Sequence, residues 1–207
     1  MYIIKPFEKE NIPFVYELMS EPSNLSSLHT ATIPLEEWKK SFAEPKDADE
    51  ENFIVYKNDI PCAWLKLNGL QNKDVAWISM LVVADKYKNQ GAGKFAVEFA
   101  FEFLHSKGFN QIGVQTTEDN NAAKNLYMKC GFSIAEIKKF KAEVGTKINS
   151  YVMLKTLESK KYSLVLPDKN HEEAYIQMMD KWEAIEENIQ PELLRRYSKS
   201  LGANVSY

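Results

Sequence analysis

The chain contains 207 residues, of which 44% are hydrophobic and 27% charged, and its formal net charge is −3. This balance excludes a disordered chain, and the acidic charge opposes nucleic acid as a partner, because nucleic-acid-binding surfaces are usually basic. No segment approaches the roughly 18 apolar residues that span a membrane, and Cys62 and Cys130 lack metal-ligand spacing. We therefore expect a cytoplasmic globular protein with no metal, no membrane association and no nucleic-acid partner.

The first half of the chain predicts helices followed by strands. Residues 2–5 are expected to form a short strand, and apolar residues at helical spacing predict helices over 12–19 and 35–42. A polar loop is expected over 26–34. Further strands are expected over 53–56, 62–67 and 75–83. The last of these should be central in the sheet, because it is almost continuously apolar.

The second half predicts two more helices and three strands. Between residues 91 and 107, Lys94, Glu98, Glu102 and His105 recur at i, i+4, i+8 and i+11, a spacing typical of a helix with one narrow exposed stripe. The other predicted elements are a strand over 112–116, a helix over 120–130 and strands over 133–140 and 148–155. This order predicts an α/β or α+β fold with helices packed against a sheet.

The most informative segment runs from Leu81 to Lys94, where a buried strand leads through a glycine-containing loop into a helix. Free amides and the positive end of the helix dipole make such a helix start an anion site. Gly91 and Gly93 would let the backbone approach a phosphate, and Lys88 or Lys94 can add a counter-charge. A diphosphate ligand is the natural candidate, and an ordinary tight turn is the alternative.

Two other nucleotide-binding patterns fit this segment poorly. A Walker loop requires a glycine where the chain has Lys88, and Ser or Thr where Phe95 follows Lys94. A dinucleotide-binding site requires its first glycine directly after an early strand, whereas residues 85–90 intervene here and no run of alternating strands and helices follows.

The same segment resembles the acyl-CoA motif of the GNAT superfamily of N-acetyltransferases, Val-x-Pro-x-x-Arg/Gln-x-x-Gly-x-Gly/Ala. The match falls on Val83, Lys88, Gly91 and Gly93, whereas Asp85 stands where proline is frequent. Lys88 replaces the usual Arg or Gln, so it keeps a cation near phosphate but lacks the planar fork of arginine. We expect acyl-CoA binding to be retained, with an altered affinity.

A second segment is similar to the family's Asn-x-x-Ala-x-x-Leu-Tyr-x-Lys-x-Gly-Phe motif and follows the glycine loop at the usual distance. The matching residues are Asn120, Ala123, Leu126, Tyr127, Lys129, Gly131 and Phe132. Two motifs at the correct separation are more specific than either alone. The resemblance is strong over 77–132 and extends across 1–157.

The resemblance implies a GNAT-like mixed, mostly antiparallel central sheet of about seven strands with helices on both faces. It implies an N-acetyltransferase that moves an acetyl group from acetyl-CoA to a primary amine of a small molecule or protein. Direct attack in a ternary complex is expected, since no cysteine is placed to form an acyl-enzyme.

The resemblance also implies roles for individual residues. The backbone of Leu81, Val82 and Val83 would pair with pantetheine, and Tyr127 would protonate the departing CoA thiolate. Asn120 and Ala123 would line the acetyl-CoA site. The loop that holds the pyrophosphate would consist of Lys88, Asn89, Gln90, Gly91, Ala92, Gly93 and Lys94.

The group that deprotonates the amine stays open at this point. Many relatives use a carboxylate on the fourth strand, but residues 75–80 carry no charge. The nearest acids are Asp74, Glu118 and Asp119, and His29 in the expected polar loop is another option. The missing strand acid leaves a second hypothesis, a catalytically silent acyl-CoA-binding or interaction module.

Residues 158–207 are expected to form an extension to the acyltransferase domain of residues 1–157. The extension should contain a strand and two helices, and its start resembles the opening of a second, truncated unit of the same kind. The first helix carries an apolar stripe formed by Tyr175, Met178, Met179, Trp182, Ile185 and Ile189. Because such a stripe is costly to leave in water, we expect it to pack on the main domain or in a homodimer interface.

Overall fold

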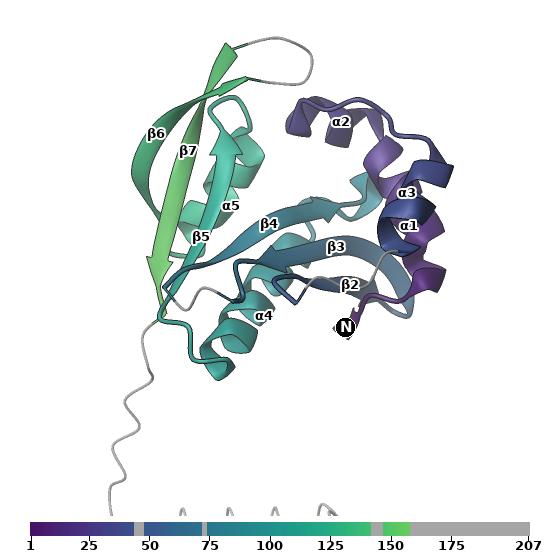
Figure 1. Ribbon diagram of the computed structural model, residues 1–207, viewed down its shortest axis with the longest axis horizontal. Helices are drawn as coiled ribbons and strands as arrows, with labels where there is room; N and C mark the ends of the chain where they lie inside the picture. Colours follow the sequence, from purple (N-terminus) through teal and green to yellow (C-terminus); the bar gives the residue numbers. More distant parts are fainter. Residues whose placement is uncertain (44–47, 72–73, 142–146, 158–207) are drawn as a thin grey trace, which may run out of the picture. The chain divides into compact units, whose positions relative to one another are not determined.

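The computed structural model describes residues 1–43, 48–71, 74–141 and 147–157 of the chain. These residues form a seven-stranded sheet with helices on both faces, which confirms the predicted fold class (Figure 1). The strands are β1 (Tyr2–Pro6), β2 (Glu51–Lys57), β3 (Ile60–Asn68), β4 (Ala76–Val83), β5 (Gln111–Thr117), β6 (Ser133–Lys141) and β7 (Lys147–Thr156). The predicted C-terminal extension lies outside the described residues.

The strand order is β1-β2-β3-β4-β5-β7-β6, and β4 is therefore the central strand, as predicted. Every neighbouring pair is antiparallel except β4 and β5, which run parallel. A parallel connection needs a long crossover, and the helix between these two strands supplies it.

Within the described residues, five α-helices accompany the sheet: α1 (Ile12–Ser20), α2 (Pro22–Leu28), α3 (Leu35–Ala43), α4 (Ala92–Ser106) and α5 (Asn121–Lys129). Short 3₁₀ turns cover Lys9–Asn11 and Asp85–Tyr87.

The described residues form two hydrophobic cores, one on each face of the sheet. One joins α4 and α5 to the sheet and includes Val97, Leu104 and Tyr127. The other joins α1 and α3 to the opposite face and includes Val15, Leu18 and Trp64.

The crossover helix α4 shows why the helical spacing predicted it correctly. The predicted polar stripe of Lys94, Glu98, Glu102 and His105 is exposed. In contrast, the side chains of Ala96, Val97, Ala100 and Leu104 have no exposed surface. Burial of one large aliphatic side chain contributes about 1.5–3 kcal/mol, so this face fixes α4 firmly on the sheet.

Helix α2 was not expected, because the sequence predicted only a polar loop over 26–34. The structure places Ser26 to Leu28 in its last turn. Proline is favoured at the first helical position, and Pro22 occupies the start of α2. The prediction missed α2 because its serine-rich sequence lacks a long apolar stripe.

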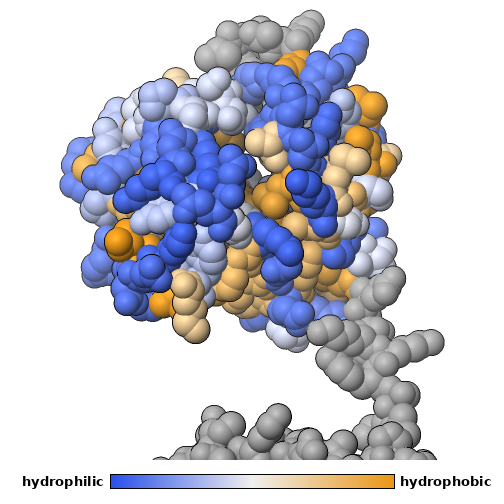
Figure 2. All heavy atoms as spheres, turned by 180° about the vertical axis from the view of Figure 1, so that it is seen from behind, coloured by the Kyte–Doolittle hydropathy of each residue, from blue (hydrophilic) through white to orange (hydrophobic). Residues whose placement is uncertain are grey.

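One face of the protein is mainly hydrophilic, with hydrophobic residues lying among the polar ones (Figure 2). The exposed large apolar side chains include Met128 on α5 and Ile134 and Ile137 on the edge strand β6. In the part of the chain that the structure describes, no helix has the length and apolar character needed to cross a bilayer.

Candidate active site

The central feature of the site is an opening between β4 and β5. The two strands pair only over Ala76 to Ile78 of β4, with Ile112 to Val114 of β5 as partners. Beyond Ile78 the strands diverge, as Figure 1 shows. We call the region between residues 79–83 of β4 and 115–117 of β5 the β4–β5 opening.

A β-bulge lies where the two strands part. Lys66 of β3 pairs with Met80 and Leu67 pairs with Ile78, so Ser79 is an extra residue on β4. A bulge bends its strand and increases the local twist. The bulge at Ser79 therefore accounts for the departure of β4 from β5 directly after Ile78.

The divergence leaves backbone groups of β4 without a strand partner on the β5 side. The Ala84 N–H donates to Cys62 O on β3, and hydrogen bonding alternates along an antiparallel pair. The backbone of Val82 therefore faces β3, whereas that of Leu81 and Val83 faces the opening. Of the three residues expected to pair with pantetheine, Leu81 and Val83 have backbone groups directed for this role.

The loop after β4 ends in an uncapped helix start. Gly91 precedes α4 with φ 95°, a left-handed conformation that favours glycine, and no side chain caps the helix. The first backbone hydrogen bond of α4 runs from Phe95 N to Gly91 O. The amides of Ala92, Gly93 and Lys94 therefore precede the helical hydrogen-bond ladder, as an anion site requires.

Other elements hold this loop in place. The Tyr2 hydroxyl donates to Gln90 O at 2.8 Å, and Lys57 Nζ donates to the Gln90 side chain at 2.7 Å. The Tyr2 ring also stacks on Phe95. Asn89 is left-handed and exposed. These contacts come from β1 and β2, which the sequence motif does not include.

The two loop lysines differ in their surroundings. Lys88 Nζ forms an ion pair with Asp85 and donates to Ser23 Oγ and Asn24 Oδ1 at 2.7 and 2.8 Å. Its cation is therefore already engaged with the start of α2. Lys94 is 65% exposed and lies 3.5 Å from Glu98. Lys94 is consequently the better-placed of the two to add charge at the helix start.

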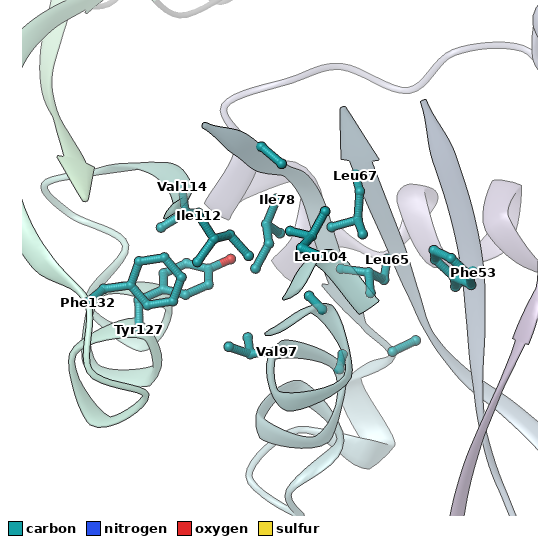
Figure 3. Close-up of a cluster of buried hydrophobic side chains, with 14 of the residues drawn as sticks. Phe53, Leu65, Leu67, Ile78, Val97, Leu104, Ile112, Val114, Tyr127 and Phe132 are labelled. Atoms are coloured by element: carbon teal, nitrogen blue, oxygen red, sulfur yellow. The ribbon is translucent and has the colours of Figure 1, made fainter. Parts of the chain in front are cut away.

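Tyr127 lies on the α4 and α5 face of the sheet, beside the point where the β4–β5 opening starts. Its side chain is buried beside Phe132, and in Figure 3 its hydroxyl points toward Ile78 and Ile112, where β4 and β5 are still paired. Burial raises the pKa of Tyr127 above its ordinary value. The hydroxyl has no hydrogen-bond partner among the described residues. The phenol is therefore protonated and available as a proton donor.

Asn120 and Ala123 begin α5. The Asn120 carboxamide oxygen accepts from Ala123 N at 3.1 Å and caps the helix, and its Nδ2 donates to Ser27 O at 3.3 Å. Ala123 is half-buried beside the α4-side core. The asparagine of this motif therefore fixes both the start of α5 and the end of α2.

Helix α2 extends from one side of the opening to the other (Figure 1). At its start, Asn24 is buried and its Nδ2 lies 3.4 Å from Val83 O at the end of β4. At its end, Ser27 accepts the bond from Asn120. Sequence reasoning missed these residues. The proline at position 22 was the one available signal for a helix here.

The structure brings together two of the candidate bases. His29 Nε2 lies 3.0 Å from Asp119 Oδ2. Burial alone would raise the pKa of Asp119, but hydrogen bonds from neighbouring side chains, including His29, outweigh it and lower the pKa. Glu118 instead accepts hydrogen bonds from the backbone and side chain of Asn149.

Neither cysteine is suited to covalent catalysis. Burial raises the pKa of Cys62 to about 11, and burial likewise raises the pKa of Cys130. Both thiols are therefore protonated near neutral pH, whereas the thiolate is the reactive form. Within the described ranges, no three His, Cys, Asp or Glu side chains gather as metal ligands would.

Comparison with known proteins agrees with this architecture. The model of the Acetyltransferase (GNAT) family matches residues 12–132. A streptothricin acetyltransferase from Escherichia coli is 25% identical over 140 residues, which cover 67% of this chain and 80% of the relative.

Two solved structures share the fold at lower sequence identity. The ribosomal-protein-S18-alanine N-acetyltransferase from Escherichia coli is 21% identical with a TM-score of 0.61, and the match covers 80% of this chain and 100% of that one. The spermidine N-acetyltransferase from Vibrio cholerae, in complex with CoA and spermine, is 16% identical with a TM-score of 0.65. That match covers 75% of this chain and 95% of the other.

Proposed function

The chain belongs to the acetyltransferase (GNAT) family, and we propose that it transfers an acetyl group from acetyl-CoA to a primary amine at the β4–β5 opening. The acceptor is an amine of a small molecule or a protein. The observation that carries the proposal is the position of three features along β4: the backbone groups of Leu81 and Val83 that face the opening, the amides that begin α4, and the Tyr127 hydroxyl next to Ile78, where the opening starts.

The residues present suit the pyrophosphate and the pantetheine of acetyl-CoA. The amides of residues 92–94 would hold the pyrophosphate, and the backbone of Leu81 and Val83 would bind the amides of pantetheine. Acetyl-CoA itself supplies the activated acetyl group as a thioester. A backbone N–H in the opening can stabilise negative charge that develops on the thioester oxygen.

Tyr127 would act as the general acid that protonates the sulfur of the departing CoA. As the amine nitrogen forms its bond to the acetyl carbon and the C–S bond breaks, Tyr127 would give its proton to the sulfur. Such acid assistance contributes about 10²–10⁴ in rate. Direct attack by the amine is favoured because both thiols of the described core are protonated near neutral pH.

The experiment that tests the proposal measures CoA thiol release with acetyl-CoA and a panel of amines. Spermidine, spermine, streptothricin and a peptide with an N-terminal alanine suit the panel, since the named relatives suggest these amine classes. Thiol release that requires an amine, with the acetylated amine seen by mass spectrometry, is the expected result. Thermal stabilisation by acetyl-CoA without turnover on any amine would instead favour a silent acyl-CoA-binding module.

The proposal includes a cytoplasmic location and a homodimer in which residues 158–207 take part. The apolar stripe predicted from Tyr175 to Ile189 supports the homodimer. Light scattering of the full chain, and of a chain ending at Glu158, would measure the effect of the extension on mass.

A further inference from the structure

We propose that His29, oriented by Asp119, accepts the proton that the amine must lose before it attacks the thioester; this inference rests on the proposed function. It assigns the base that β4 does not provide, because β4 carries no ionisable side chain between Ala76 and Val83. The argument depends on where His29 lies, which of its nitrogens is free, and which charges surround it.

The position of His29 follows from the contacts of α2. The helix begins beside Val83, at the end of β4, and ends beside Asn120, which follows β5. His29 directly follows α2 and is therefore held next to the C-terminal end of β5, where its imidazole contacts Asp119. Leu28, its neighbour, packs with the α1-side core, whereas Tyr127 belongs to the α4-side core. The base and the acid thus approach the opening from opposite faces of the sheet.

The hydrogen bond to Asp119 determines which imidazole nitrogen can accept a proton. A carboxylate only accepts hydrogen bonds, so in the neutral imidazole this contact assigns the hydrogen to Nε2 and the lone pair to Nδ1. Nδ1 has no hydrogen-bond partner in the described part of the chain, and it is not among the buried atoms without a partner. An accessible, unprotonated nitrogen is the form of imidazole that acts as a base.

The backbone of His29 is also unusual. Its φ of 52° and ψ of 38° place it in the left-handed region, where a residue other than glycine is uncommon. Its N–H caps α2 by donating to Leu25 O and Ser26 O. Glycine would meet this backbone requirement with less strain. A histidine at this position is therefore consistent with a role for its side chain.

The other charged side chains near α2 either bind residues other than His29 or are exposed. At the start of α2, Asp85 and Lys88 pair with each other, and Glu21 accepts from the Asp85 N–H. Glu118 binds Asn149. Helix α1 contributes one charged side chain, the exposed Glu17. Among the described residues, Asp119 is the one charged group that forms an ion pair with His29.

The proton balance of the reaction is complete with these two residues. The acceptor ammonium gives one proton to His29 Nδ1, and the imidazolium is stabilised by Asp119 and later loses the proton to water. The nitrogen then forms its bond to the acetyl carbon as the C–S bond breaks. Tyr127 gives its proton to the sulfur, and the second proton lost from the nitrogen restores the phenol. The products are the amide, CoA thiol and one proton.

Asp74 is a poor rival for this role because of its place in the fold. Strand β4 starts at Ala76, and its first residues are the ones paired with β5. Asp74 therefore precedes the closed end of the two strands, away from the β4–β5 opening.

The test uses three variants and the panel amine that gives the highest turnover. His29→Asn tolerates the left-handed backbone and can still donate to Asp119, but it cannot accept a proton. His29→Gly allows the same left-handed backbone conformation and leaves space for imidazole added to the buffer. Asp119→Asn would donate to Nε2 and so place the imidazole hydrogen on Nδ1, the wrong tautomer.

We expect each variant to lower kcat at neutral pH by about 10²-fold or more, with unchanged acetyl-CoA affinity. If His29 is the base, the pH profile of kcat should differ between wild type and His29→Asn, and imidazole should restore activity to His29→Gly. Wild-type kcat and pH dependence in His29→Asn would overturn the role of His29 alone. A wild type without turnover on any amine would overturn the proposed function itself.

Discussion

Gly93 of α4 and Leu126 of α5 lie in direct contact, because a Cβ atom added at Gly93 would come within 3.0 Å of Leu126 Cδ2. Both residues belong to the motifs that resemble the family pattern. Their contact gives Gly93 a packing role in addition to any role at the phosphate, and it links the two motifs in space.

Gly93→Ala should therefore lower stability through overpacking, by about 1 kcal/mol. In a Leu126→Ala background the same change should be neutral or stabilising, because the atoms that clash are gone and alanine favours a helix over glycine. Urea unfolding of the four proteins in this double-mutant cycle measures the coupling. Equal effects of Gly93→Ala in both backgrounds would show that the contact does not constrain position 93.

Lys94→Glu should weaken acetyl-CoA binding without lowering the melting temperature. The substitution reverses a charge beside the expected pyrophosphate position. The favourable interaction of an acidic residue in the first turn with the helix dipole offsets the lost exposed ion pair with Glu98. We expect an affinity loss of about 3-fold to 30-fold at low salt that shrinks at high salt, as measured by calorimetry. Lys39→Glu, on exposed α3, makes the same charge change elsewhere. Equal affinity losses in the two variants would argue against a local phosphate site.

Asp85→Asn should reduce stability at neutral pH but not in acid. The hydrogen bond from Lys88, followed by that from Ser23, lowers the pKa of Asp85 below its ordinary value. A lowered pKa means that the carboxylate stabilises the fold above its unfolded pKa, near 3.9, and that this contribution is lost as the pH falls through the folded pKa.

The melting temperatures of wild type and Asp85→Asn should therefore differ by about 1–3 °C near pH 7 and converge below about pH 3, because Asp85 is half-exposed and its ion pair is screened. Asp59→Asn is the control, since Asp59 is exposed in the β2–β3 turn and makes no ion pair within the described chain. A difference that stays constant from pH 7 to pH 3 would show that the carboxylate charge is not the cause.

Local sequence patterns predicted the parts of the site that lie within continuous segments. The helical spacing from Lys94 to His105 and the two glycine-containing motifs place α4, α5 and the loop between β4 and α4 correctly. The divergence of β4 from β5 could not be predicted in this way, since it depends on a bulge at Ser79 defined by pairing with β3.

Contacts between residues far apart in the sequence could not be predicted from local patterns either, because they depend on how separate elements pack together. His29 and Asp119 are separated by 90 positions, and neither has a local signal for the other. The engagement of Lys88 with Ser23 and Asn24 depends on α2, which was not predicted. Family resemblance suggested a phosphate role for Lys88, whereas the structure shows its ammonium bound at the start of α2.

The most direct test of the account is Tyr127→Phe, assayed for amine-dependent CoA release alongside stability and acetyl-CoA affinity. Phenylalanine keeps the ring packing against Phe132 and removes a hydroxyl that has no hydrogen-bond partner among the described residues, so the melting temperature should stay the same or rise. We predict that kcat falls by about tenfold to a thousandfold while acetyl-CoA affinity is unchanged. Unchanged kcat, under conditions in which acetyl transfer limits the rate, would contradict the assignment of Tyr127 as the proton donor at the β4–β5 opening.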